Sequence, residues 1–290
     1  HHIVKTTPPP SSFQAWRMAM RPISLLIALA PVMLGTALGY RDSGTADLSL
    51  AALALLAALL MQLITNLQND VGYTERGAEY QGQRIGLPRA TALGWLTPRQ
   101  VKVAIRALSC VAAALGCALF MLRGWPVLAM GAMSLLAALA YMGGPKPIAY
   151  TPWGELTVLV FFGPVAVLGT GWLLTSSLSA VGVLASIGMG SLAAAALAVN
   201  NHRDRDHDRL VGRKTFAVRF GVKPSQHLFT TLLVTPFVAV LGMAFLVASI
   251  WPLTGYLMTP LVVRLRRDFM SCPGGFSYNP ILFRAFKLTL

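Results

Sequence analysis

Long apolar runs recur from one end of this chain to the other, and they constrain its fold more than any other feature. The run SLAAAALAV at residues 191–199 is typical, and only 12% of the 290 residues are charged, about half the fraction found in soluble domains. A helix needs about 20 predominantly apolar residues to cross a bilayer. The runs lack the apolar–polar alternation of membrane barrel strands. The sequence therefore predicts an all-α fold, a polytopic transmembrane helical bundle.

Eight spans can be placed on the apolar runs, with a ninth beginning near the end of the chain. The eight predicted spans cover about residues 22–40, 48–67, 101–122, 125–143, 153–175, 179–200, 227–250 and 251–265. The ninth begins at Asn279 and Pro280 and is too short to cross a bilayer alone, so it ends at the interface or is truncated. Because no soluble domain or linker interrupts the pattern, we expect residues 1–290 to form a single domain.

Lysine and arginine gather on one side of the predicted topology. The net charge is +14, and 19 of the 24 basic residues lie near the amino terminus or around the loops that follow the even-numbered spans. The loops of the other side contain only Arg41 and Arg123. By the positive-inside rule, the amino terminus and the loops at 68–100, 144–152 and 201–226 face the cytoplasm. The positive charge is thus an orientation signal, and we expect the lipid bilayer, and no nucleic acid, as the partner.

The stretch NNHRDRDHDRLVGRKT, residues 200–215, places many charges directly after an apolar run. Residues four apart lie on one helix face, so Asn200, Asp204 and Asp208 form one stripe and Asn201 lies on the next. Such carboxylate and amide oxygens suit Mg²⁺ when water and phosphate oxygens complete its shell. The basic residues of the same stretch suit the remaining phosphate charge: Arg203, Arg209, Arg213 and Lys214.

A similar polar helix end follows the second predicted span. Asn66 and Asp70 share one stripe, and Asn69 and Tyr73 share the neighbouring one. The acidic residues Glu75 and Glu79 follow. After them comes a loop in which Arg84 and Arg89 can bring two guanidinium groups to a phosphate. Charged residues at span ends are usually solvated and anchor the helix in the interface. Polar residues there are costly, however, and two such stripes on the same side favour a functional site.

The stretch YMGGPKPIAYTPWGE, residues 141–155, allows two interpretations. One is a tight Gly-Pro turn between two spans. The other is that Lys146 and the tyrosines border the same cytoplasmic cavity. Glu155 would be costly near the start of a span unless it faces protein or water.

Taken together, these stretches resemble the UbiA superfamily of intramembrane prenyltransferases. The resemblance rests on NLQND with RIGLPRATALGWLTPRQV, on YMGGPKPIAYTPWGE and on NNHRDRDHDRLVGRKTFAVRFG, and it covers about residues 15–265. It is greatest for the menaquinone branch, whose acceptor is 1,4-dihydroxy-2-naphthoate. The resemblance implies eight to nine spans around a central cavity, in which two aspartate-rich motifs hold Mg²⁺ and the diphosphate of a polyprenyl donor.

The resemblance also implies individual site residues. The catalytic and metal-binding residues are Asp70, Asp204 and Asp208, with Glu79 as an additional metal ligand. The diphosphate-binding residues are Asn66, Asn69, Arg84, Lys146, Asn200, Asn201, Arg213 and Lys214. One departure stands out, because the superfamily typically has a further aspartate where this chain has Tyr73. It leaves the number of metal ions and the identity of the acceptor open.

The function implied by the resemblance is a Mg²⁺-dependent transfer of a polyprenyl group from polyprenyl diphosphate to 1,4-dihydroxy-2-naphthoate. CO₂ and diphosphate leave, and demethylmenaquinone forms at the bacterial cytoplasmic (inner) membrane. One alternative is transfer to another aromatic ring, such as 4-hydroxybenzoate or a quinolone. A second, prompted by Tyr73, is a protein that binds the donor with little turnover. A non-enzymatic organic-anion transporter is the third, since polytopic bundles with repeated polar helix ends allow it.

Overall fold

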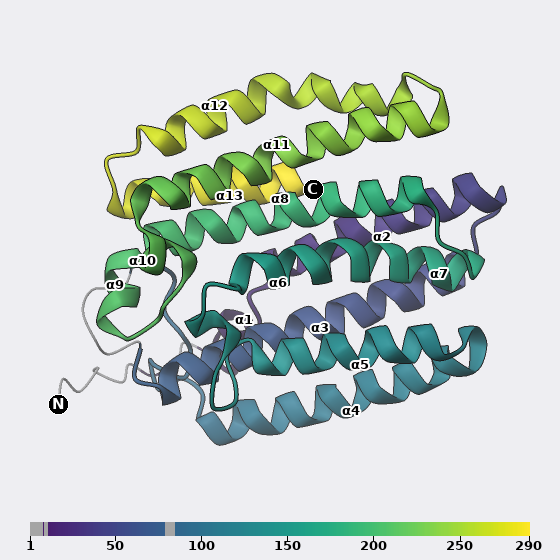
Figure 1. Ribbon diagram of the computed structural model, residues 1–290. Coiled ribbons are helices and arrows are strands. Elements are labelled where there is room, and N and C mark those ends of the chain that lie inside the picture. Colours follow the sequence, from purple (N-terminus) through teal and green to yellow (C-terminus); the bar gives the residue numbers. More distant parts are fainter. Residues whose placement is uncertain (1–7, 9–10, 79–84) are drawn as a thin grey trace.

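The computed structural model is an elongated bundle of roughly parallel and antiparallel helices (Figure 1). It describes residues 8, 11–78 and 85–290, and every regular element in this part of the chain is a helix. The five longest helices are α2 (Pro22–Ser43), α3 (Leu48–Glu75), α4 (Pro98–Arg123), α8 (Ala180–Arg203) and α11 (Val222–Val247). The shorter ones are α1 (Ser12–Met20), α5 (Trp125–Ala140), η1 (Ile148–Tyr150), α9 (Arg205–Leu210), α10 (Phe216–Phe220), η3 (Trp251–Met258), α12 (Thr259–Met270), η4 (Gly275–Ser277) and α13 (Tyr278–Thr289).

Among the described residues, six helical segments are long and apolar enough to cross a membrane. They are the five longest helices and the composite helix Gly154–Thr175, and they confirm six of the predicted spans. The expected total of eight or nine spans is not confirmed. Helix α5 is apolar but has only 16 residues. The region of the predicted eighth span begins as the 3₁₀ helix η3, and α12 after it is strongly amphipathic with Arg264, Arg266 and Arg267 on it.

The composite helix consists of α6 (Gly154–Val160), the π-helix η2 (Phe161–Leu168) and α7 (Gly169–Thr175). Pro164 lies inside the π-helix and has no N–H to donate. Next to Pro164, the composite helix crosses α8 so closely that the two backbones are in contact. A Cβ at Gly190 would lie 2.1 Å from the carbonyl oxygen of Leu159, and one at Gly163 would lie 2.3 Å from that of Ser186. Only glycine therefore fits at this crossing.

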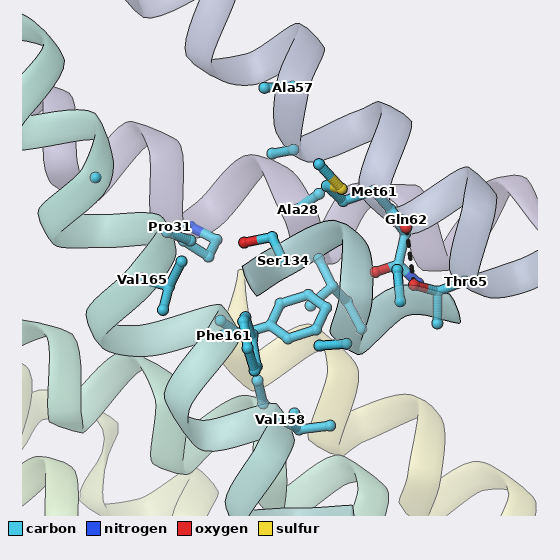
Figure 2. A pocket seen from close by; sticks show the side chains of 18 of the residues that line it. Ala28, Pro31, Ala57, Met61, Gln62, Thr65, Ser134, Val158, Phe161 and Val165 are labelled. Atoms are coloured by element: carbon cyan, nitrogen blue, oxygen red, sulfur yellow. Dashed lines mark hydrogen bonds between the residues drawn. The ribbon is translucent and has the colours of Figure 1, made fainter. Parts of the chain in front are cut away.

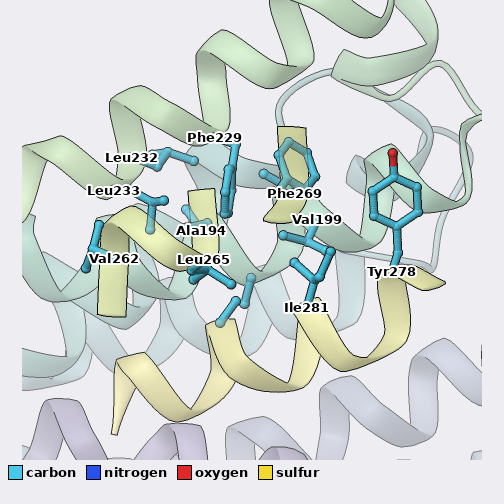
Figure 3. Packing of buried hydrophobic residues seen from close by; sticks show 14 residues of the cluster. Ala194, Val199, Phe229, Leu232, Leu233, Val262, Leu265, Phe269, Tyr278 and Ile281 are labelled. Carbon is cyan, nitrogen blue, oxygen red and sulfur yellow. The ribbon is translucent and has the colours of Figure 1, made fainter. Parts of the chain in front are cut away.

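Helices α11, α12 and α13 pack on α8 through one buried apolar cluster (Figure 3). Phe229 and Phe269 are fully buried, with ring centroids 4.3 Å apart. Beside them, His202 is hydrogen-bonded to the Ser225 hydroxyl at 2.9 Å and to the Tyr278 hydroxyl at 3.1 Å. The end of α8 is thereby joined to α11 and α13.

Helix α8 is the best covered of the long helices. In its most apolar stretch 61% of the residues are buried, compared with 17–39% for the other five segments. Helices α3 and α8 both end at the end of the bundle where α9 and α10 lie (Figure 1). The two polar helix ends recognised in the sequence are thus at the same end of the molecule.

Candidate functional site

A cavity of about 380 Å³ lies inside the bundle. Most of its wall is apolar (Figure 2), and includes Ala28, Pro31, Ala57, Val158, Phe161 and Val165. Asn69, Tyr141 and Asn200 line it at the end where the polar motifs lie. Along α3 the lining extends from Asn69 to Ala54, which is about 22 Å at the rise of an α-helix. The cavity is therefore long, polar at one end and apolar along the rest.

The composite helix lines this cavity with pairs of neighbouring residues that repeat every four positions. The lining residues are Thr157 and Val158, Phe161 and Phe162, Val165 and Ala166, Gly169 and Thr170, and Leu173. In a regular α-helix, a residue four positions further along lies about 40° further around the axis, so a row of residues with this spacing winds slowly around the helix. A π-helix has more residues per turn, so the same row winds in the opposite direction there. The π-helix thus keeps all the pairs on one face, and both phenylalanines face the cavity.

The two asparagines of the first motif have different surroundings. Asn66 donates to the carbonyl oxygen of Met20 at 2.8 Å and to the hydroxyl of Ser24 at 2.7 Å, and it accepts from Gln62 at 3.0 Å. It therefore ties α3 to the junction of α1 and α2. Asn69 lines the cavity, and its buried Oδ1 accepts no hydrogen bond from any described residue.

Asp70 is fully buried, and it holds the loop that follows the first motif. Its Oδ2 accepts from the backbone N–H of Ala90 at 2.8 Å. Its Oδ1 accepts from the backbone N–H of Thr91 at 3.0 Å and from the Thr91 hydroxyl at 2.6 Å. The same hydroxyl also lies 2.7 Å from the hydroxyl of Thr74. Residues 89–91 are consequently fixed against the end of α3.

The ring of Tyr73 lies against two arginines. The guanidinium carbon of Arg89 is 4.6 Å from the ring centroid, and that of Arg213 is 5.0 Å away. One arginine follows the first motif in the chain and the other follows the second. All three side chains are buried, so the two polar helix ends meet at this tyrosine. Nearby, Arg76 lies over the ring of Tyr150 and donates to the carbonyl oxygen of Gly144.

The second motif is held by ion pairs at the end of α8. Arg203 donates to both carboxylate oxygens of Asp204, to Asn200 at 2.8 Å and to Asn279 of α13 at 2.9 Å. Arg213 donates to Asp208 at 2.7 Å. Both ion pairs are almost completely buried.

Arg213 also joins the second motif to the turn at residues 141–150. Its Nε donates to the carbonyl oxygen of Ala149 at 3.1 Å, and the backbone N–H of Lys214 donates to Tyr150 at 3.1 Å. Tyr141 lines the cavity and packs against the buried cluster that contains Tyr73, so this tyrosine lies where the cavity meets the polar cluster.

Glu155 lies beside the second motif and is buried. Its Oε1 accepts from the amide of Asn201 at 3.0 Å. Its Oε2 and the Oδ1 of Asn201 are buried and accept no hydrogen bond from the described part of the chain. Glu155 thus faces protein, which is one of the two conditions under which the sequence analysis expected a glutamate to be tolerated there.

The structure brings most of the predicted site residues to one end of the bundle. Asn66, Asn69, Asp70, Asn200, Asn201, Asp204, Asp208 and Arg213 lie there. Lys146 and Lys214 are exposed, and the predicted Arg84 and Glu79 lie outside the described residues. Glu75 pairs with Lys102 at 2.5 Å and is not drawn into the site. From the sequence, Arg89 was expected on a loop able to bring guanidinium groups to a phosphate, and Tyr73 was noted as a departure from the superfamily; neither was among the site residues that the resemblance implied.

The two motifs differ in how well they suit a metal ion. No three acidic, histidine or cysteine side chains in the described ranges converge as a complete metal cluster. The second motif still offers two carboxylates and two amides, beside buried oxygens of Asn201 and Glu155 that a cation would satisfy. Mg²⁺ often takes one or two carboxylates and completes its shell with phosphate and water. The oxygens of the second motif therefore suit Mg²⁺ in kind and number, and both motifs also use carboxylate oxygens internally: those of Asp204 accept from Arg203, and those of Asp70 accept from loop donors.

Comparison with known proteins gives consistent matches along the chain. The profile of the UbiA prenyltransferase family matches residues 28–270. The 1,4-dihydroxy-2-naphthoate octaprenyltransferase of Escherichia coli K12 is 33% identical over 284 residues, which is 96% of this chain and 92% of that protein. The protein of the same name from Mycobacterium tuberculosis is 34% identical over 273 residues, covering 94% of this chain and 91% of that one.

Solved structures show the same fold. A UbiA homolog from Archaeoglobus fulgidus bound to GPP and Mg²⁺ superposes with a TM-score of 0.66 at 16% identity, covering 95% of this chain and 99% of that chain. The apo structure of a UbiA homolog from Aeropyrum pernix K1 superposes with a TM-score of 0.68 at 17% identity, covering 91% of this chain and 95% of that one.

Proposed function

The chain belongs to the UbiA prenyltransferase family, and from this premise we propose that it transfers a polyprenyl group from polyprenyl diphosphate to 1,4-dihydroxy-2-naphthoate. CO₂ and diphosphate leave, and demethylmenaquinol forms, the reduced form of demethylmenaquinone. The observation that carries the proposal is the cavity, which extends about 22 Å along α3 and has Asn200 at its polar end, where the buried Arg203 donates to it. A lipid tail with an anionic head matches this distribution of charge. The names of the bacterial relatives support the acceptor.

Arginines at the polar end would bind the donor diphosphate. Arg89 and Arg213 are buried at the point where the two motifs meet. Guanidinium N–H groups match phosphate oxygens in geometry and charge. Cleavage of the allylic carbon–oxygen bond leaves its electron pair on the diphosphate, and cations that are already in place stabilise that charge as it develops.

Asp204 and Asp208 would hold Mg²⁺, with Asn200 and Asn201 beside them. When bound, the ion would neutralise charge on the leaving diphosphate. Arg203 and Arg213 pair with these two carboxylates and orient them. The fold relatives that contain prenyl diphosphates and Mg²⁺ support this role for the metal.

The apolar cavity would protect the reacting prenyl carbon from water. Positive charge grows on this carbon as the diphosphate leaves, and water would quench it. Phe161 and Phe162 face this space, and aromatic faces attract cations. The acceptor ring also needs polar partners close to the diphosphate. Gln62, Thr65 and Tyr141 line the cavity there.

Six apolar helical segments make this an integral membrane protein. We propose that it lies in the bacterial cytoplasmic membrane, with the amino terminus and the polar end of the bundle in the cytoplasm. The basic residues of the polar loops support this orientation. Helices α5, η3–α12 and α13 would raise the number of spans to eight or nine.

The proposal is tested with the purified full chain in liposomes. Supplied with 1,4-dihydroxy-2-naphthoate and a polyprenyl diphosphate, it should form demethylmenaquinol with Mg²⁺ and none with chelator. Asp204→Asn and Asp208→Asn should abolish the product. Product from 4-hydroxybenzoate or a quinolone alone would contradict the acceptor and keep the reaction class. No product from any ring, with no diphosphate binding, would contradict the enzyme and favour an organic-anion transporter.

A further inference from the structure

Glu155 and Asn201 form a buried pair, and each keeps one oxygen to which no described residue donates. Only 5% of Glu155 and 2% of Asn201 is exposed. A carboxylate can only accept hydrogen bonds, so the amide N–H of Asn201 has to face Glu155, and this fixes the orientation of the amide. The atoms left over are Oε2 of Glu155 and Oδ1 of Asn201. Buried acceptors of this kind are costly, which indicates that a ligand supplies the missing donor.

The pair lies directly beyond the polar end of the cavity. Val158 lines the cavity one turn after Glu155, and Leu197 lines it one turn before Asn201. Residues one turn apart share a helix face. Glu155 and Asn201 therefore each continue a row of residues that faces the cavity, one from the composite helix and the other from α8.

The hydroxyl of Tyr141 connects the pair to the wall of the cavity. Tyr141 is one of the lining residues. A Cβ at Gly154 would lie 3.5 Å from the hydroxyl oxygen of Tyr141 and 3.9 Å from Nδ2 of Asn201. The hydroxyl and the amide thus lie on either side of the residue that precedes Glu155. A ligand at this end of the cavity would meet one hydroxyl group and two acceptor oxygens in a small space.

The chemistry of the pair favours the aromatic acceptor over the prenyl donor. An ionised diphosphate offers acceptor oxygens, whereas the pair needs a donor. In 1,4-dihydroxy-2-naphthoate the 1-hydroxyl group is adjacent to the carboxylate and donates to it internally, so the 4-hydroxyl group is the free donor. The negative charge of Glu155 also turns the ring carboxylate away, because like charges placed together are costly.

We propose that Glu155 and Asn201 bind the 4-hydroxyl group of the acceptor ring through these two oxygens. The contact selects rings that carry a hydroxyl group at this position, and it sets the orientation in which the ring meets the prenyl carbon. Glu155 and Asn201 are then specificity-determining residues for the acceptor. The inference rests on the proposed function, because the ligand is the acceptor of that reaction.

The affinity for rings with and without the 4-hydroxyl group tests the inference. The purified full chain in detergent is saturated with Mg²⁺ and geranyl S-thiolodiphosphate, an unreactive donor analogue, and ring binding is measured by calorimetry under argon. The rings are 1,4-dihydroxy-2-naphthoate and 1-hydroxy-2-naphthoate. The unmodified chain should bind the second ring at least about tenfold more weakly, as expected for a lost hydrogen bond to a charged group. In Glu155→Gln the difference should fall to about threefold or less, because a neutral amide replaces the carboxylate.

Glu75→Gln is the matched control, because Glu75 pairs with Lys102 at the surface and should have no effect on the difference between the rings. The affinity of Glu155→Gln for the donor analogue should stay within about twofold of the original value. Thermal midpoints verify that both variants fold.

Each other outcome contradicts a defined part. Equal binding of both rings by the unmodified chain would overturn the inference without the need for a variant, and so would a full difference kept in Glu155→Gln. A variant that loses the donor analogue while it still distinguishes the rings would assign these oxygens to the metal ion instead. No binding of either ring and no product from the acceptor would contradict the proposed function itself.

Discussion

Arg203 donates to both carboxylate oxygens of its neighbour Asp204, through Nε at 2.7 Å and through Nη2 at 2.9 Å. The pair is almost completely buried. The same guanidinium reaches Asn279 on α13. A residue proposed to hold the metal ion therefore depends on this arginine for its charge balance, and the arginine also connects it to the carboxy-terminal helix.

Replacing Arg203 should expose this dependence. In Arg203→Gln the buried carboxylate of Asp204 loses its partner, and breaking such a pair costs about 3–5 kcal/mol of folding free energy. The thermal midpoint in detergent should fall. Mg²⁺ together with geranyl S-thiolodiphosphate, an unreactive donor analogue, should raise the thermal midpoint more in the variant than in the unmodified chain. The reason is that the ion supplies the missing positive charge.

Arg209→Gln is the matched control, since the one ion pair of Arg209 with a described residue is the exposed pair with Asp206 at 3.8 Å. Such pairs contribute little to stability. Equal ligand-induced shifts in Arg203→Gln and in the control would contradict this account of Asp204.

The hydroxyl of Tyr278 should stabilise the attachment of α13. Tyr278→Phe leaves one ring nitrogen of the buried His202 without its partner at 3.1 Å. An unpaired buried polar group costs about 1–3 kcal/mol. Hydrogen exchange should quicken in α13 before the rest of the bundle. Tyr256→Phe loses a comparable bond of an exposed tyrosine to Phe237 and should change exchange little. Unchanged protection of α13 in Tyr278→Phe would argue against the link.

The crossing of α8 with the composite helix should tolerate no side chain. In Gly190→Ala the new Cβ would meet the Leu159 carbonyl oxygen at 2.1 Å, so two backbones must separate. Overpacking of this kind costs about 1–3 kcal/mol, which should appear as a lower thermal midpoint. Gly116→Ala is the control, because its Cβ would meet nothing within 4 Å. Similar midpoints for the two variants would show that the crossing is looser than the structure indicates.

Side chains added inside the cavity should select for shorter donors. Gly131 lines the cavity, and a Cβ there meets nothing within 4 Å. Gly131→Leu should therefore fold, narrow the cavity beyond its polar end, and lower kcat/KM for long polyprenyl diphosphates by at least about tenfold, while geranyl diphosphate is still used. Leu136→Phe alters an exposed position on the same helix and serves as the control. An equal loss for long and short donors would place the tail elsewhere.

Much of the helical framework could be predicted because run length and hydropathy are local properties. The ends of the helices were less predictable. The second span was expected to end near residue 67, but α3 continues to Glu75. Its last turns are polar in sequence, yet Asp70 and Tyr73 are buried among side chains from other parts of the chain. Tertiary contacts therefore extend the helix beyond its apolar run. Pro164 signalled an irregularity, but it could not specify a π-helix.

The candidate site was predictable where four-residue spacing decides it. Asn200, Asp204 and Asp208 follow such a spacing: Asn200 lies in the last turn of α8, Asp204 lies between α8 and α9, and Asp208 lies in α9. The contacts of Tyr73 with Arg89 and Arg213 are of another kind. They join segments that are distant in the sequence, and no local pattern encodes them. The same holds for the loop donors of Asp70.

The π-helix divides the composite helix into two parts that can change separately. Such a wide turn accommodates one extra residue, so it shifts the helical phase of the part after it by a fixed amount relative to the part before it. Thr157 and Val158 face the polar end, whereas Thr170 and Leu173 face the far end of the cavity. Substitutions in one part can adapt the wall to a different ring, and substitutions in the other can adapt it to a different tail. A single transmembrane segment thereby offers evolution two adjustable surfaces, with the Gly163–Gly190 crossing as the fixed point between them.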